Sequence, residues 1–119
     1  MQRSAARDII SMEAFNQVIS ALEPILAQKG FSSIEQKSHP EAFGSRHVEF
    51  GNGKEFVRLI WDGKEELFLL QSRAVASAAS EIGWGDILLV PLKSKLGERK
   101  IIEAGVREMR SALSAHLGI

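Results

Sequence analysis

The sequence predicts an α+β protein in which one antiparallel sheet of four to five strands is flanked by an N-terminal and a C-terminal helix. This prediction rests on two observations. Apolar residues recur every three or four positions near both ends of the chain, which is the spacing of an amphipathic helix. In the middle, strand-like segments alternate with glycine-containing turns, as in a β-meander. Because each helix has one apolar stripe to bury, we expect both helices to pack on the same face of the sheet.

The first predicted helix covers residues 11–29. Ser11 is a suitable N-cap, and Gly30 stands where a left-handed residue commonly ends a helix. Pro24 lacks the N–H for one helical hydrogen bond, so we expect it to kink or restart the last turn. Residues 1–10 are expected to be a flexible N-terminus or an extension of the helix. The apolar stripe consists of Met12, Phe15, Val18, Ile19, Leu22, Ile25 and Leu26.

Segments with strand character follow. They are residues 31–37, 48–50, 56–61 and 67–70. Residues 51–53 (Gly-Asn-Gly) tolerate the positive φ of a tight turn, and Asp62 with Gly63 signals a two-residue hairpin. Residues 87–92 are apolar and fit either a strand or a short helix. Since Pro91 disfavours a central strand, we predict a fifth strand at an edge of the sheet.

The C-terminal helix also has a single apolar stripe, and Gly118 is expected to end it. A chain of 119 residues has room for one hydrophobic core. We therefore expect residues 1–119 to form a single globular domain. The apolar stripe of the C-terminal helix consists of Ile102, Val106, Met109, Leu113 and Leu117.

Composition excludes several classes of function. The 15 Lys and Arg residues are balanced by 15 Asp and Glu, which argues against a nucleic-acid binder. The absence of cysteine rules out disulfides and thiolate chemistry and suits a reducing compartment. The N-terminal sequence has no apolar signal-peptide core, and the longest apolar run, residues 87–92, is too short to span a bilayer. We expect a cytoplasmic protein that binds neither nucleic acid nor membrane.

The sequence contains no motif for catalysis or metal binding. His39, His47 and His116 lack the spacing of metal ligands, and each is interpreted as structural. Glu65 and Glu66 are adjacent, so on a strand they face opposite ways and cannot share one site. We expect no catalytic residue, no metal and no cofactor, and a protein that is not an enzyme.

The candidate site follows from strands that are apolar on both faces. In residues 56–61, the side chains of Phe56, Arg58 and Ile60 alternate with another apolar set. Two helices on one face leave one of these sets uncovered, although such strands need cover on both faces. The cover could be the loop around residues 74–84, a second protein chain, or the walls of a ligand cavity.

We predict that a protein partner provides this cover. The predicted partner-binding residues are Val57, Leu59, Trp61 and Phe68, with Arg58 as a polar contact. A shift of one residue in strand register would exchange the two faces. On the predicted register, Trp61→Glu abolishes self-association or partner binding and leaves the helical signal intact.

The predicted function is a non-enzymatic interaction module that forms a homodimer or binds a protein partner. The order helix, antiparallel sheet, helix is similar in topology to small bacterial interaction proteins such as secretion chaperones and toxin-immunity proteins, and no site residue carries over from them. The alternative is a small-ligand-binding domain with a pocket between sheet and helices, in which Arg58 or His47 supplies the polar contact.

Overall fold

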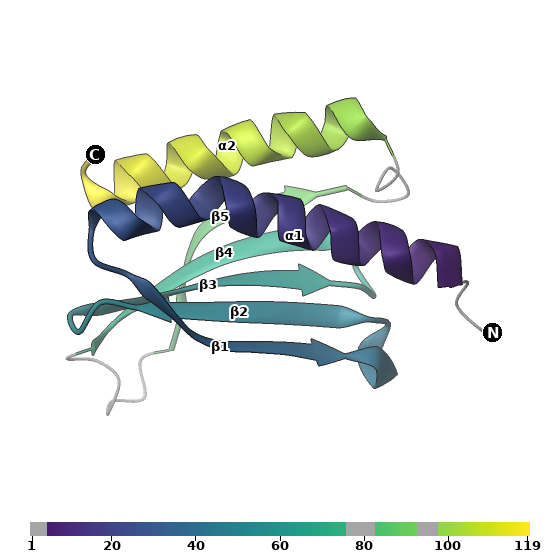
Figure 1. Ribbon diagram of the computed structural model, residues 1–119, viewed down its shortest axis with the longest axis horizontal. Coiled ribbons are helices and arrows are strands. Elements are labelled where there is room, and N and C mark those ends of the chain that lie inside the picture. The colour runs from purple at the N-terminus through teal and green to yellow at the C-terminus, as the bar shows by residue number, and fades with distance from the viewer. Residues whose placement is uncertain (1–4, 76–82, 93–97) are drawn as a thin grey trace.

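The computed structural model describes residues 5–75, 83–92 and 98–119 of the chain. A layer of two helices lies over one face of a five-stranded antiparallel sheet (Figure 1). This confirms the predicted α+β class. The elements follow in the order α1 (Ala5–Gln28), β1 (Ser32–His39), the 3-10 turn η1 (Pro40–Ala42), β2 (Ser45–Gly51), β3 (Glu55–Asp62), β4 (Leu67–Ala74), β5 (Gly85–Pro91) and α2 (Arg99–Leu117).

The sheet is a meander in which each strand pairs with the next one along the chain, in the order β1-β2-β3-β4-β5. Strands β1 and β5 are therefore its two edges. The ambiguous apolar segment forms β5, as predicted, and Pro91 is its last residue. The β1–β2 register shifts between Ser33 and Glu35, and the β4–β5 register shifts between Leu70 and Gln71.

Helix α1 is longer than predicted. It begins at Ala5, so the segment before the predicted start is a helical extension, and the buried Ser11 lies inside the helix instead of capping it. The helix continues through Pro24 to Gln28 without restarting. Its end is as predicted: Gly30 has φ 76°.

Two hydrogen bonds close that end of α1. The N–H of Gly30 donates to the carbonyl of Ala27 at 3.1 Å, and the N–H of Phe31 donates to the carbonyl of Leu26 at 3.1 Å. This is a Schellman-type ending, which satisfies carbonyls that the helix itself leaves unpaired. It also directs the chain straight into β1.

The turn between β3 and β4 is longer than the two residues predicted. Strand β3 ends at Asp62 and β4 begins at Leu67, so the connection has four residues. The Asp62 carboxylate accepts the N–H groups of Lys64 and Glu65, both at 3.0 Å, and Glu66 takes a left-handed φ of 55°. Asp favours turns through such local hydrogen bonds, and these fit a four-residue loop as well as a tight one.

The hydrophobic core lies between the helix layer and the sheet. Every second residue of β2 to β5 points toward the helices, and the apolar stripes of α1 and α2 meet them. The Trp61 and Phe68 rings lie 4.9 Å apart between centroids. The sheet contributes Val48, Phe50, Val57, Leu59, Trp61, Phe68, Leu70 and Val90. The helices contribute Phe15, Val18, Leu22, Leu26, Ile102, Met109 and Leu113.

Among the described residues, neither helix combines the length and the apolar character needed to cross a bilayer.

Candidate functional site

The structure settles which face of the sheet the helices cover. Val57, Leu59, Trp61 and Phe68, the predicted partner-binding residues, are each only 1% exposed beneath α1 and α2. They belong to the core and not to the uncovered face on which they were predicted, and the alternate set of side chains lies on that face. Arg58 is the one residue of the predicted site that lies on the opposite face.

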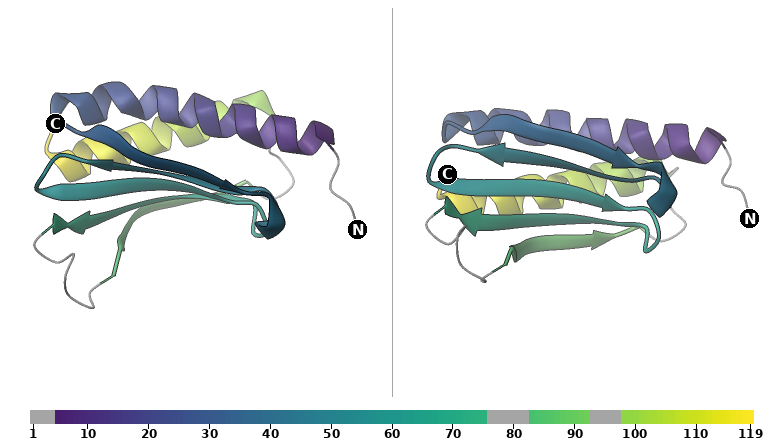
Figure 2. Two further views of the ribbon diagram at one scale, coloured as in Figure 1. Left: turned by 60° about the horizontal axis from the view of Figure 1, so that its bottom comes forward. Right: turned by 90° about the horizontal axis from the view of Figure 1, so that it is seen from below.

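We call that opposite side of the sheet the outer face. Within residues 5–75, 83–92 and 98–119, no helix covers it, and the strands lie in front of the helices when seen from below (Figure 2). The strand register arranges its side chains in rows that cross the sheet. An apolar row consists of Ile60, Leu69 and Leu89, and a polar row consists of Glu49, Arg58, Gln71 and Asp86.

The polar row is joined by side-chain hydrogen bonds. The Nε–H of Arg58 donates to Oε1 of Gln71 at 2.8 Å, and Nε2 of Gln71 donates to a carboxylate oxygen of Asp86 at 2.8 Å. Gln71 is buried, and these two bonds supply the partners that a buried amide requires. Burial lowers the pKa of Arg58, the charge of Glu49 raises it, and the charge of Arg73 lowers it further.

Trp84 is the centre of a cluster of arginines and aromatic rings beside this row. The guanidinium carbon of Arg58 lies 4.1 Å from the Trp84 ring centroid, and that of Arg73 lies 4.8 Å from it. Phe56 adds a ring 6.4 Å from Trp84 and 5.5 Å from the Arg73 guanidinium. Cation–π contacts of this kind hold the half-buried indole in one orientation.

The apolar row lies next to the polar one. Ile60 is paired with Leu69, and Leu69 is paired with Leu89. Leu89 is 48% exposed, and Ile60 and Leu69 are partly exposed. Cross-strand apolar pairs are ordinarily buried by a second layer. Burial of this row would therefore contribute more free energy of association than burial of any other part of the outer face.

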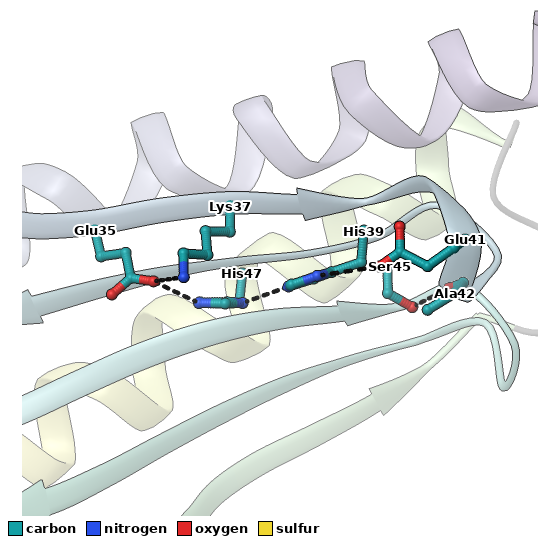
Figure 3. Close-up of polar contacts among 7 residues, drawn as sticks. All are labelled: Glu35, Lys37, His39, Glu41, Ala42, Ser45 and His47. Atoms are coloured by element: carbon teal, nitrogen blue, oxygen red, sulfur yellow. Dashed lines mark hydrogen bonds and ion pairs between the residues drawn. The ribbon is translucent and has the colours of Figure 1, made fainter.

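A pair of histidines lies at the β1 side of the outer face (Figure 3). Nε2 of His39 and Nδ1 of His47 are 3.2 Å apart, and the two rings stack with centroids 5.3 Å apart. A carboxylate lies beyond each ring: Glu35 is 3.8 Å from His47, and Glu41 is 3.8 Å from His39. One imidazole donates to the other, so the contact requires at least one neutral, accepting nitrogen.

The surroundings of the histidine pair shift two pKa values. Burial lowers the pKa of His47, and the charge of His39 lowers it further, against the opposing charges of Glu35 and Glu49. The pKa of Glu35 is lowered, chiefly by the hydrogen bond and charge of Lys37, whose ammonium lies 3.0 Å away.

The contact between the two histidines was not predicted from the sequence. They come together because the β1–β2 register pairs Lys37 with His47 and His39 with Ser45, which makes the histidines diagonal neighbours on one face. The sequence places His39 and His47 on either side of the turn at residues 40–44. That position is compatible with a contact, but the strand register is needed to show that the two side chains meet.

Arg58 and His47 do not lie where the ligand-pocket alternative requires them. Both project from the outer face and not toward the helix layer. The hollows near the helices are lined by neither residue. One of about 520 Å³ lies between β5 and α2, and one of about 410 Å³ lies between α1 and the β1 edge of the sheet. Another of about 610 Å³ lies between α1 and α2, and its lining includes Ile25, Arg107, Arg110 and Ser114. In the described part of the chain, no three His, Asp or Glu side chains gather as metal ligands would.

Comparison with known proteins identifies no relative: no protein-family model, no curated protein and no solved structure matches the chain.

Proposed function

We propose that this chain is a non-enzymatic interaction module that binds a protein partner through the outer face of its sheet. The observation that carries the proposal is the apolar row of Ile60, Leu69 and Leu89 beside the Trp84 cluster, on a face that no helix of the described residues covers. A cytoplasmic location fits a chain without cysteine.

The composition of this face supports a protein partner. Trp and Arg are enriched among the residues that dominate binding energy, and here one tryptophan is stacked on two arginines. Because those stacks already hold Trp84 in place, binding would cost little side-chain entropy at that position. The apolar row beside it would supply area removed from water.

The chemistry of the face also indicates what the partner surface contains. The Arg73 guanidinium stacks on Trp84 and its Nε is buried, so its terminal N–H groups are the ones that could meet a partner. Arg58 carries further N–H groups beyond the one bound to Gln71. A matching surface would set an apolar strip against Leu69 and Leu89 and carboxylate or carbonyl oxygens near the two guanidinium groups.

The test is quantitative capture of partners with face variants. Leu69→Lys and Trp84→Ala change the apolar row and the aromatic cluster, and Gln17→Ala on the exposed side of α1 is the matched control. We expect each face variant to reduce recovery of a specific partner by about tenfold or more, as loss of an interface anchor does, and the control to recover it fully.

Hydrogen exchange of the isolated complex then gives the location of binding. New protection in β3, β4 and β5 is the expected result. A partner that is retained by both face variants, or whose protection maps to the helix layer, would contradict the proposal.

A further inference from the structure

We infer that β5 pairs with β5 of a second copy, so that two five-stranded sheets join into one continuous antiparallel sheet. This interface uses the edge of the sheet and the neighbouring surface of α2. It uses the backbone of Leu89, whereas the proposed function rests on side chains of the outer face, that of Leu89 among them.

The two edges of the sheet differ in how they are protected against such pairing. Edge strand β1 is polar, exposed along most of its length, and interrupted by the shift between Ser33 and Glu35. Charges and bulges of this kind discourage edge-to-edge association. Edge strand β5 also has a register shift in its pairing with β4 and ends in Pro91, but it carries the apolar run of residues 87–90, one acidic residue and no lysine. Of the two edges among the described residues, the edge at β5 thus offers an added strand the more apolar surface.

The backbone of β5 presents hydrogen-bonding groups to that edge. The N–H of Leu92 donates to the carbonyl of Glu66 at 2.9 Å, in register with the pairs Leu67–Pro91 and Leu69–Leu89. Since bonding direction alternates along an antiparallel strand, the N–H and carbonyl of Leu89 point away from β4. Pro91 occupies an equivalent outward position, so its missing N–H costs the sheet of one copy nothing and leaves only its carbonyl for an added strand.

A hollow on the helix side of β5 extends this surface. It has a volume of about 520 Å³ and lies between the strand and α2. Leu88, which is partly buried and packs against the core, forms its floor. A strand added beyond β5 would place its inward-facing side chains over this hollow. Its lining consists of Leu88, Arg107, Glu108, Ser111 and Ala112.

The lining of the hollow favours a second copy as the occupant. Leu88 and one turn of α2 line the same hollow. If two β5 strands pair about a two-fold axis at Leu88, these turns of α2 in the two copies lie on opposite sides of the axis and run antiparallel. Each copy would bring Arg107 toward Glu108 of the other, and neither residue forms an ion pair among the described residues. Ser111 and Ala112 are small enough to allow the helices to approach.

The helix contribution matters because a strand pair alone is a small interface. A stable complex generally buries about 800 Å² on each partner, and a seven-residue strand needs neighbouring surface to reach that area. Leu88 and the α2 turn beside it add such surface. An extended peptide of another protein could form the strand pair but would bring no matching helix.

The experiment measures the dimer dissociation constant by light scattering and sedimentation of the full chain. Leu89→Pro removes the outward N–H and leaves the bonds to β4 untouched, whereas Leu89→Ala shortens the same side chain and keeps the N–H. We expect a dimer that Leu89→Pro weakens by at least about tenfold and that Leu89→Ala leaves near the wild-type value. Circular dichroism confirms that both variants are folded.

A charge exchange on α2 tests the interface without touching the strand. Glu108→Arg sets two positive groups against those of the second copy, and we expect it to weaken the dimer. Adding Arg107→Glu to it restores opposite charges across the axis, and we expect the double variant to recover the dimer. If neither Leu89→Pro nor Glu108→Arg changes the dimer dissociation constant, the inference is overturned.

The outcome is distinguishable from failure of the proposed function. Leu69→Lys and Trp84→Ala lie on the outer face and are expected to leave the dimer intact. A chain that is monomeric at high concentration, including one whose β5 instead takes up an extended peptide, would overturn the β5 pairing alone. Partner capture that ignores the outer-face variants would overturn the proposed function alone.

Discussion

At the scale of single residues, His47 makes the stability of the protein depend on pH. Burial and the charge of His39 lower its pKa from the ordinary value of 6.5, so the unfolded chain binds the proton more readily than the folded chain. Stability is therefore full above that value and falls as the pH drops through it. The loss ends once the pH is below the lowered pKa of the folded state. Glu35 acts in a separate window, because its stabilising contribution is lost only below the carboxyl value of 4.5.

We expect the melting temperature to fall between pH 7.5 and pH 5.5, because the unfolded chain takes up the proton at His47 more readily than the folded chain does. His47→Gln should flatten this part of the profile. His39→Gln should flatten it less, since it removes the charge of His39 and leaves the larger effect of burial. Calorimetry at a series of pH values makes the comparison. A His47→Gln profile as steep as that of the wild type would contradict the assignment.

Gly63 has a different role, which is steric. A Cβ built on it would lie 2.0 Å from the carbonyl oxygen of Phe43, a contact that only movement of the backbone could relieve. We predict that Gly63→Ala destabilises the fold by about 1–3 kcal/mol, as overpacking does. The matched control is Gly83→Ala, because a Cβ there meets nothing within 4 Å. Denaturant unfolding gives the free energy of unfolding of both variants. Equal stabilities of the two variants would contradict the steric role of Gly63.

At the scale of elements, Asn52 joins the β2–β3 turn to the end of α1. Its side-chain oxygen accepts the N–H groups of Lys54 and Glu55, both at 2.9 Å, and its Nδ2 donates to the carbonyl of Lys29 at 3.0 Å. The same residue thus shapes the hairpin and satisfies a carbonyl at the helix end.

Asn52→Ala removes all three bonds, and we expect it to cost about 1–3 kcal/mol of stability. Asn52→Asp keeps the acceptor and loses only the donor to Lys29, so its loss should be smaller. Urea unfolding monitored at 222 nm gives both values. The bridging role would be contradicted by an alanine variant within a few tenths of the wild type.

The elements themselves could be predicted from the sequence because each carries its own periodicity. The helix stripes, the edge strand at Pro91 and the helix ends at Gly30 and Gly118 are local features, and the structure has them as predicted. The predicted length of the β3–β4 turn was wrong, because the hydrogen bonds of the Asp62 side chain are compatible with both a two-residue and a four-residue loop. Local patterns specify elements better than the connections between them.

The candidate site was harder to predict because it depends on relations between elements. Alternation along residues 56–61 separates two sets of side chains but does not say which set the helices cover, since both are apolar. The contacts of Trp84 with Arg58 and Arg73, and of His39 with His47, need the register of neighbouring strands. None of these is contained in the spacing of a single segment.

At the scale of the whole molecule, the decisive feature is that one face of the sheet is covered and the other is not. Two neighbouring residues of β4 show the difference in exposure between the two faces. Leu70 is 1% exposed beneath the helices, whereas Leu69 faces outward between Ile60 and Leu89. Both are leucines in the same strand, so they differ only in the layer that they face.

We therefore predict that Leu70→Ala costs about 2–5 kcal/mol of stability and Leu69→Ala less than about 1 kcal/mol. The same reasoning reverses the expectation for Trp61→Glu: this variant places a charge in the core and should lose the helical signal instead of keeping it. Chemical unfolding of the leucine pair and circular dichroism of the tryptophan variant test the layer assignment together. If Leu69→Ala proved as costly as Leu70→Ala in the monomer, the outer face would already be packed within the chain, and a partner would have little left to cover.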